Sequence, residues 1–372
     1  MSLLPEPGWL YLRIFPGHGD QSADAPVALE HSADVLLTHC LLPTLRRLQQ
    51  AGSIQGYFFL RYAEQGYHLR VRCRVRDQDQ HSVARTALLA ALDTHLLDDP
   101  HTFPGASDSA GLIADGRIRD SHYQPELDKY GGRSGLDVVE SHFHGCTDLA
   151  AEALALAAQG FKRDHLSVWL TGQIMYALEL NGAEAAGLLA GYARYWMPAT
   201  GMDMGQASDA LEQAYTTRQR AIAGLLPDAR GDSVYASTYP QVERHLGTAR
   251  HLFVNTVARL RTLEDQGRLH SSALAPLEQH AIASERIGRH RLTYLLIVPN
   301  LLHMMNNRIA VNVLTEARLA FFMARNFAGE TAVQRSALPV MLQPAPLHSI
   351  PPAPPPGAAT SRVDHVARSQ ES

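Results

Sequence analysis

The chain has 372 residues, of which 45% are apolar, and a formal net charge of −4 at neutral pH. This length and apolar content suffice for one large domain with a full hydrophobic core. The slightly acidic balance argues against a general nucleic-acid-binding protein, because such domains carry an excess of basic residues.

The first 120 residues predict an antiparallel sheet with helices between its strands. Aromatic and β-branched residues in "WLYLRIF" favour a first strand. Two further strand-like runs flank Gln65-Gly66, which is typical of a hairpin turn. Leucines at helical spacing precede this hairpin, and Gly52 is the expected end of their helix. In chain order we expect a strand at 9–15, a helix at 31–51, hairpin strands at 57–64 and 67–75, a helix at 79–97, and a mainly loop-like segment at 98–120 that has room for a short strand.

From about residue 135 the pattern becomes mainly helical, because apolar residues recur at helical spacing. The expected helices cover 135–159, 166–181, 183–196, 208–224, 239–264, 273–298 and 301–325. The last one is predicted to begin after Pro299 with Asn300 as its cap. The Pro-rich segment at 338–372 cannot bury enough surface to fold, so we expect a disordered tail. The predicted fold class is α+β, with a single domain at 1–337.

The cysteines and the apolar runs indicate the compartment. Cys40, Cys73 and Cys146 are far apart and odd in number, so neither a disulfide framework nor a zinc spacing follows. A reducing cytoplasm fits this pattern. The first residues lack a basic and then an apolar region, so no signal peptide is expected. The most apolar run, "LTYLLIVPNLLHMM", is too short and interrupted to span a bilayer.

Arginine alternates with small apolar residues in "YHLRVRCRVR", residues 67–76. A strand would bring Arg70, Arg72, Arg74 and Arg76 to one face, where like charges repel. One interpretation is an edge strand kept soluble by exposed charge. The other is a ligand site in which Arg70 and Arg72 converge with Arg61 of the preceding strand. Guanidinium groups grip carboxylates with two hydrogen bonds, so such a site suits a ligand with several carboxylates.

Two further segments carry groups suited to chemistry. In "YQPELDKYGG", Gly131 and Gly132 predict a turn that holds Tyr130, and Glu126 can neutralise one of the arginines. In "LLHMMNNR", His303 and Asn307 are four residues apart and share a helix face. A partly buried histidine beside an amide is either a core residue or a proton-transfer group.

No metal centre is predicted. Glu140, His142 and His144 in "ESHFHG" do not share one helix face, and no second ligand pair has a matching spacing. The chain also has no GxSxG, P-loop or GxGxxG motif.

Three segments in this order resemble a known family. They are "WLYLRIF", the hairpin "YFFLRYAEQGYHLRVRCRV", and "YQPELDKYGG…VVESHFHGCTDLA" leading to "LLHMMNNRIAV". Together, over residues 8–327, they resemble the C-terminal elimination domain of class I lanthipeptide dehydratases. That domain also occurs alone as the thiopeptide-type bacteriocin biosynthesis protein.

The resemblance implies a reaction and its residues. A partner enzyme esterifies Ser or Thr of a precursor peptide with glutamate from glutamyl-tRNA, and the elimination domain then expels glutamate to leave dehydroalanine or dehydrobutyrine. Arg70 and Arg72 match the arginines of the family's "HLRLR" strand, and His303 matches its catalytic histidine. The family also has an arginine within the segment near the double glycine, where this chain has Pro125 and Lys129; Lys129 is the candidate replacement, as a point charge and not a planar fork. The remaining substrate-binding candidates are Arg61, Tyr62, Glu126, Lys129, Tyr130, Asn307 and Arg308. Neither a cofactor, a metal, a directly bound nucleic acid nor a membrane is required.

Two alternatives stay open at this point. Thiopeptide pyridine synthases share the family fold and join two dehydroalanines in a formal [4+2] cycloaddition with loss of the leader peptide. Glu278, Ser284 and His290 are then the candidate residues, although their spacing does not put them on one helix face. The third possibility is a non-catalytic scaffold that binds the precursor peptide.

Overall fold

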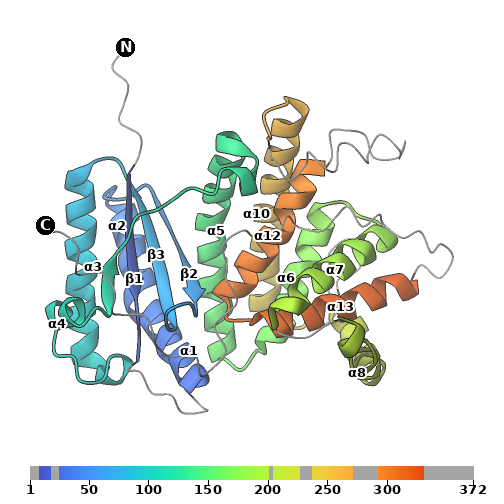
Figure 1. Ribbon diagram of the computed structural model, residues 1–372, viewed down its shortest axis with the longest axis horizontal. Coiled ribbons are helices and arrows are strands. Elements are labelled where there is room, and N and C mark those ends of the chain that lie inside the picture. The colour runs from blue at the N-terminus through green and yellow to red at the C-terminus, as the bar shows by residue number, and fades with distance from the viewer. Residues whose placement is uncertain (1–7, 18–24, 201–203, 227–236, 271–291, 331–372) are drawn as a thin grey trace, which may run out of the picture.

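The computed structural model describes residues 8–17, 25–200, 204–226, 237–270 and 292–330. It has an N-terminal half built on an antiparallel sheet and a helical second half (Figure 1). The predicted α+β class is therefore confirmed. The predicted Pro-rich tail and most of the predicted helix at 273–298 lie outside the described residues, and so does the domain end at 337.

The sheet has four strands in the order β2-β3-β1-β4, with every neighbouring pair antiparallel. The strands are β1 (Gly8–Ile14), β2 (Gly56–Tyr62), β3 (His68–Val75) and β4 (Ile118–Asp120). The predicted hairpin is β2-β3, and Gln65 and Gly66 take positive φ angles of 60° and 100° in its turn. Because β3 pairs on both sides, the interpretation of the arginine row as a soluble edge strand is wrong.

Helices of the first half cover the face of the sheet opposite to the arginines. They are α1 (Ala25–Val35), the π-helix η1 (Leu36–Leu41), α2 (Leu42–Gln50), α3 (Gln78–Asp98), the 3-10 turn η2 (Pro100–Thr102) and α4 (Ser109–Ala114). The single helix predicted at 31–51 is thus three pieces. Pro43, at the start of α2, has no N–H for the α-helical ladder, which accounts for the π-turn before it. Gly52 ends α2 with a φ of 72°, as predicted.

The second half is formed by long helices. They are α5 (Gly132–Ala158), α6 (Arg163–Ala177), α7 (Gly182–Trp196), α8 (Met204–Leu225), α10 (Pro240–Asp265), α12 (Leu292–Arg308) and α13 (Val313–Glu330), with 3-10 turns η3 (Asp128–Tyr130) and η4 (Met197–Thr200). Helix α5 stands between the sheet and the other helices of this half (Figure 1) and packs on both β2 and α10.

The predicted final helix differs in both its start and its end. Pro299 lies inside α12, which begins at Leu292, and the Asn300 amide donates to the Leu296 carbonyl at 3.2 Å instead of capping a helix. The chain leaves α12 after Arg308, because Ala310 has a φ of 57°, and α13 follows as a separate helix. One predicted helix is therefore two, and the residues of the histidine motif all lie on the first of them.

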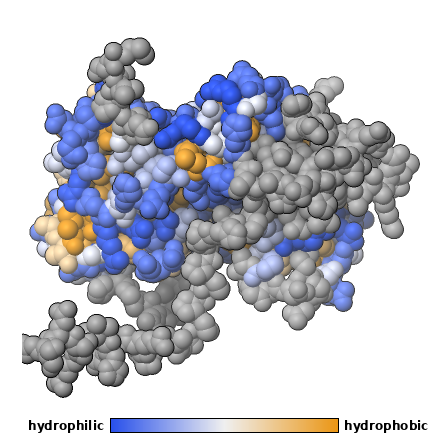
Figure 2. Space-filling model, turned by 45° about the horizontal axis from the view of Figure 1, so that its top comes forward, coloured by the Kyte–Doolittle hydropathy of each residue, from blue (hydrophilic) through white to orange (hydrophobic). Residues whose placement is uncertain are grey.

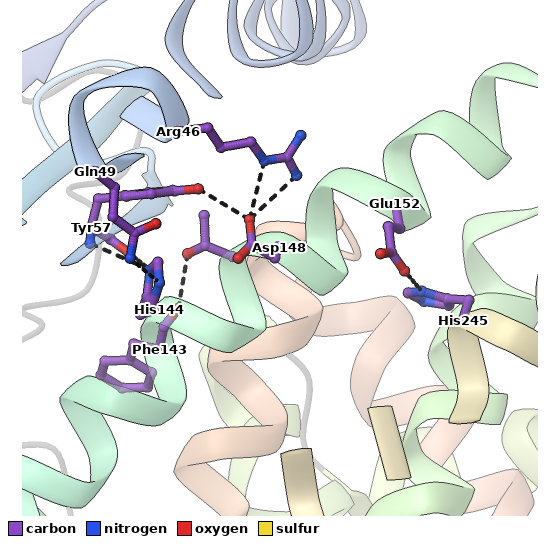
Figure 3. A network of polar contacts seen from close by, with 9 residues as sticks. Arg46, Gln49, Tyr57, Phe143, His144, Asp148, Glu152 and His245 are labelled. Carbon is purple, nitrogen blue, oxygen red and sulfur yellow. Dashed lines mark hydrogen bonds and ion pairs between the residues drawn. The ribbon is translucent and has the colours of Figure 1, made fainter. Parts of the chain in front are cut away.

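Polar contacts join the sheet half to α5 (Figure 3). Asp148 accepts hydrogen bonds from Arg46 of α2 at 3.3 Å and from Tyr57 of β2 at 3.1 Å. His144 contacts Gln49 at 2.8 Å and the Tyr57 carbonyl at 3.1 Å. These contacts fix the sheet against α5 and so set the position of the arginine face relative to α12.

Much of the described surface visible in one view is polar (Figure 2). In the view of Figure 2, blue hydrophilic residues cover most of it and orange hydrophobic residues form smaller patches. Within the described ranges, we find no helix whose length and apolar content would allow it to cross a membrane.

Candidate functional site

The arginine face of β3 is the starting point of the site. Arg70, Arg72 and Arg74 are partly exposed, and the residues between them are buried in the core. Those buried residues are Leu69, Val71, Cys73 and Val75. The predicted alternation along this strand is confirmed. The register places Tyr11 and Phe58 opposite Arg72, so aromatic rings flank the middle arginine on both sides.

Arg72 is held by aromatic rings. Its guanidinium carbon lies 4.7 Å from the centroid of Tyr11, 5.4 Å from Phe58 and 4.6 Å from Tyr123. Tyr123 is itself fixed, because its hydroxyl donates to Glu140 at 2.8 Å. Arg72 forms no ion pair with a carboxylate of the described residues. The rings therefore fix the orientation of the Arg72 guanidinium, and its positive charge remains available to an anionic ligand.

Arg70 is oriented from two sides. Its guanidinium carbon lies 3.3 Å from the centroid of the Tyr62 ring, and its Nε donates to His68 Nε2 at 3.2 Å. Burial, more than the neighbouring Arg70, lowers the pKa of His68 to about 4, so the imidazole is neutral at pH 7. His68 then donates from Nδ1 to the Gly66 carbonyl at 2.9 Å and accepts at Nε2. Glu64 lies 3.6 Å from Arg70 and is about half exposed.

Arg308 brings a second source of positive charge, from α12. Its side chain is fully buried, and within the described ranges Nη1 alone has a hydrogen-bond partner, the Met304 carbonyl at 2.8 Å. Its guanidinium lies 4.7 Å from the Phe143 ring and 6.0 Å from the Phe58 ring that Arg72 also contacts. Burial lowers the pKa of Arg308 to about 10, so it remains charged at pH 7. A buried cation without a carboxylate partner is costly, which favours an anionic ligand nearby.

His303 lies on the same helix and belongs to a polar network. Its Nδ1 is 3.0 Å from Oε2 of Glu316 on α13, and its ring stacks on Trp196 at 4.0 Å. The other Glu316 oxygen accepts from the Asn306 amide at 3.2 Å, and Ser167 donates to Asn306 at 2.8 Å. Nε2 of His303 makes no hydrogen bond with any described residue, so this nitrogen is free for a ligand.

Burial favours the neutral form of both partners in the His303–Glu316 pair. It lowers the pKa of His303 to about 3, with smaller contributions from Lys129 and Arg308. Burial also raises the pKa of Glu316 well above its usual value. The 3.0 Å distance is compatible with an ion pair. Because burial removes water from both groups, however, the pair is neutral, with the proton on Glu316.

The "YQPELDKYGG" segment joins the two parts of the site. Lys129 is close enough to His303 to lower its pKa, and Tyr130 is buried against Phe143 with a ring separation of 5.7 Å. Gly131 and Gly132 have φ angles of 78° and 85°, so the predicted turn is confirmed. Glu126 pairs with Lys129 at 3.3 Å. The prediction that Glu126 neutralises an arginine is therefore wrong, because Lys129 is its nearer cation.

Arg61 does not join this cluster. It lies opposite Leu69 in the register and so points to the other face of the sheet. There it pairs with Asp34 of α1 at 2.6 Å and donates to Tyr67 and to the Arg308 carbonyl, each at 3.0 Å. The predicted convergence of three strand guanidiniums is wrong, because residues 61 and 70 project from opposite faces.

Asn307 also has a structural contact. Its side-chain amide accepts from the Arg61 N–H at 2.8 Å and donates to the Arg61 carbonyl at 2.7 Å. It thus completes the hydrogen bonding of β2, which is an edge strand of the sheet, and docks α12 on it.

The histidines of "ESHFHG" have separate partners. His142 contacts Thr256 at 2.9 Å, Glu140 accepts from Tyr123, and His144 binds Tyr57. Among the residues that the structure describes, no three His, Cys, Asp or Glu side chains are arranged to hold a metal.

The sequence did not point to Glu316 or to Arg13. Glu316 is one of several acidic residues on the second half's helices, and only the break after α12 brings it to His303. Arg13 of "WLYLRIF" lies directly opposite Arg70, a position that strand alternation and the hairpin could have suggested once the pairing of β1 with β3 was known. The candidates Glu278, Ser284 and His290 lie outside the described residues.

Arg61→Met is expected to destabilise the fold by about 3 kcal/mol, since breaking a buried pair leaves an uncompensated charge. The value lies at the low end because Arg163 also pairs with Asp34. Urea unfolding measures it. Arg85→Met, which breaks the partly exposed pair with Asp120, is the matched control with an expected cost under about 1 kcal/mol. Equal costs for the two variants would contradict a structural role for Arg61.

The fold is an antiparallel sheet joined through α5 to a helical bundle. Arginines on one sheet face and a buried histidine–carboxyl pair, which are connected through Arg308, define an α+β protein with a cationic site. The family described as "Lantibiotic biosynthesis dehydratase C-term" matches residues 9–327. The chain belongs to this family, and membership assigns it to the maturation of ribosomally made peptides. No curated protein sequence matches the chain.

Solved structures share the fold at low sequence identity. TsrL is 18% identical with a TM-score of 0.59, and the match covers 92% of this chain and 99% of TsrL. TbtD, a pyridine synthase from thiomuracin biosynthesis, is 16% identical with a TM-score of 0.57, covering 88% and 100%. The tRNA-dependent lantibiotic dehydratase MibB from Microbispora sp. 107891 is 17% identical with a TM-score of 0.51, covering 87% of this chain and 28% of MibB.

Proposed function

We propose that this protein eliminates glutamate from glutamylated Ser or Thr residues of a precursor peptide and so forms dehydroalanine or dehydrobutyrine. The observation that carries the proposal is the meeting of unpaired cations with a neutral acid–base pair. Arg72 and Arg308 have no carboxylate partner among the described residues, and both contact the Phe58 ring. Arg308 and Lys129 are near enough to His303 to shift its pKa.

We assign the arginines the role of binding the carboxylates of the glutamate leaving group. Glutamate carries carboxylate groups, and a guanidinium binds a carboxylate through two parallel hydrogen bonds. Arg70, held by His68 and Tyr62, and Arg72, held by its three rings, are preorganised for this contact. Fixed positive groups also stabilise the negative charge that develops when the α-proton is removed. Tyr62, Tyr130 and Lys129 line the same region.

The proton transfers are assigned to His303 and Glu316 as one unit. The reactive form of the pair is the one populated above the raised pKa of Glu316, in which Glu316 has lost its proton and accepts the Nδ1–H of a neutral His303, so that Nε2 has a free lone pair. Nε2 takes the α-proton while the Nδ1 proton passes to Glu316, which gives the neutral pair that burial favours. The Cβ–O bond then breaks, its electron pair leaves with the glutamate carboxylate, and the reverse proton path protonates that carboxylate. The pair's basicity then follows the raised pKa of Glu316.

This chemistry requires no cofactor or metal. It does require a partner that glutamylates the precursor from glutamyl-tRNA, and we propose that this chain binds the precursor peptide and not the tRNA. The three free, buried cysteines suit a cytoplasmic location.

Mass spectrometry of a purified reaction tests the proposal. Given a glutamylated precursor peptide, the protein is expected to release glutamate and leave dehydroamino acids. Arg70→Ala and His303→Ala are expected to leave glutamyl adducts, with rates lowered by about 10²-fold or more. Arg76→Ala, at the exposed end of the same strand, is the matched control and should retain activity. Full activity of both site variants would contradict the assignment.

A second candidate is a pyridine synthase that joins two dehydroalanines with loss of the leader peptide. The observation that favours it is the fold comparison, in which TbtD has a TM-score of 0.57 and MibB one of 0.51. A peptide that already carries dehydroalanines separates the two reactions. Leader release from that peptide, without glutamate loss from the first, would favour the synthase. Binding without either reaction would favour a scaffold.

A further inference from the structure

A row of three arginines crosses the sheet next to the proposed site. Arg13 of β1 lies directly opposite Arg70 of β3 on one side and directly opposite Arg119 of β4 on the other. Residues in direct register share a face and have Cβ atoms about 4.5–5.5 Å apart, where like charges destabilise the sheet. The row therefore costs stability unless something neutralises it.

The described residues provide little neutralisation. Among the described residues Arg13 has no ion-pair partner, and its buried Nε has no hydrogen-bond partner. Arg119 is exposed and donates to the Gly116 carbonyl at 2.6 Å, with its guanidinium 4.6 Å from the Phe15 ring. Of these three arginines, Arg70 alone has a carboxylate neighbour in the described part of the chain, the half-exposed Glu64. The three guanidiniums thus have one weak carboxylate between them, in a chain whose net charge is negative.

The surroundings of the row add rigidity but no charge. His68, which donates to Gly66 and accepts from Arg70, is fully buried and stacks on Phe15 at 4.6 Å. Because burial keeps His68 neutral, it contributes neither a fourth cation nor a counter-ion. Phe15 and His68 form an apolar support beside guanidiniums that have unused donors. The positive charges of the three guanidiniums that no carboxylate neutralises favour binding of a ligand with at least two anionic groups.

We propose that Arg13, Arg119 and Arg70 bind an acidic segment of a peptide that runs over the sheet. Three neighbouring strands span about 10 Å, and carboxylates at alternate positions of an extended peptide lie about 7 Å apart, within reach of long arginine side chains. Identifying this peptide as the precursor rests on the proposed function, whereas the anionic site itself does not. Arg70 belongs both to this anionic site and to the proposed elimination site, so a peptide bound along the three arginines reaches the elimination site.

Peptide carboxylates fit the row better than nucleic acid does. Nucleic-acid binding draws its affinity from many phosphate contacts on an extended basic surface. Here the formal charge is −4 and the row holds three cations on one sheet face. A short run of acidic side chains matches that number.

Fluorescence anisotropy with a fluorescein-labelled peptide of alternating Glu and Ser tests the site without any reaction. Arg13→Gln combined with Arg119→Gln is expected to weaken binding about tenfold or more, as the loss of two charge-assisted contacts predicts. Arg218→Gln with Arg259→Gln removes the same charge from exposed helix positions and should leave binding unchanged. The Arg119→Gln single variant, at an exposed edge-strand position, keeps the test valid if the double variant does not fold.

Four outcomes decide whether the proposed site exists and what it binds. Equal binding by wild type and the Arg13/Arg119 variants would overturn the site. Tighter binding of an oligouridylate of the same length, through the same arginines, would overturn the ligand class. In the elimination assay the double variant is expected to raise KM about tenfold with kcat retained. If wild type eliminates nothing while probe binding still depends on Arg13 and Arg119, the proposed function fails and the anionic site stands.

Discussion

Glu316→Gln is expected to lower the rate of glutamate elimination by about 10²–10⁴-fold, the range typical of a lost acid–base group. The amide keeps the size of the side chain but cannot take the Nδ1 proton of His303. Proton uptake at Nε2 would then create an imidazolium, which burial disfavours, as the lowered His303 pKa of about 3 indicates. Single-turnover kinetics with a glutamylated peptide measures the loss.

The pH profile separates this role from a structural one. Below the raised pKa of Glu316 the pair already holds its second proton and cannot accept another, so the wild-type rate should rise with pH through that pKa. In Glu316→Gln this rise should disappear, leaving a low rate that is flat above about pH 4, since the His303 pKa is low. A lowered rate with an unchanged pH profile would contradict the proton path.

The chain offers a matched control for this variant. Glu152 of α5 and His245 of α10 form a second histidine–glutamate pair (Figure 3). The distance from His245 Nδ1 to the Glu152 carboxylate is 3.0 Å. This pair has no contact with the arginine face. Glu152→Gln should therefore leave both the rate and its pH dependence unchanged. A similar loss in both variants would mean that the effect reflects general destabilisation.

Arg72→Lys is expected to lower kcat/KM for elimination by about 10²–10³-fold, the effect of removing one preorganised donor for developing charge. Lysine keeps the charge but not the planar fork, and it cannot be held flat among Tyr11, Phe58 and Tyr123. The measurement is steady-state kinetics, in which both kcat and KM should change.

Arg74→Lys is the matched control for this second variant. Arg74 lies two residues further along the same face, but its guanidinium is 4.0 Å from Glu140 and so is partly neutralised within the protein. Its replacement should change kcat/KM by less than about threefold, a range typical of an exposed charge. If Arg74→Lys is as damaging as Arg72→Lys, total positive charge matters and the ring-held geometry does not.

Local sequence patterns predicted the strands and most helices because their signals are short-range. Alternation in β3, the Gln65-Gly66 turn and the double glycine at the start of α5 each depend on a few adjacent residues, and each is confirmed. Pro299 misled the prediction of the final helix. A proline inside a helix costs stability, but buried apolar residues on either side of it keep α12 continuous.

The sequence by itself determined that arginines share one face of β3 and that His303, Asn307 and Arg308 share one helix, since periodicity fixes which neighbours point together. Tertiary structure alone decided that Arg61 faces away, that Glu316 meets His303 and that Arg13 stands between two other arginines. The reason is physical: these relations depend on strand register and on packing between segments far apart in the chain, and no local pattern encodes either one.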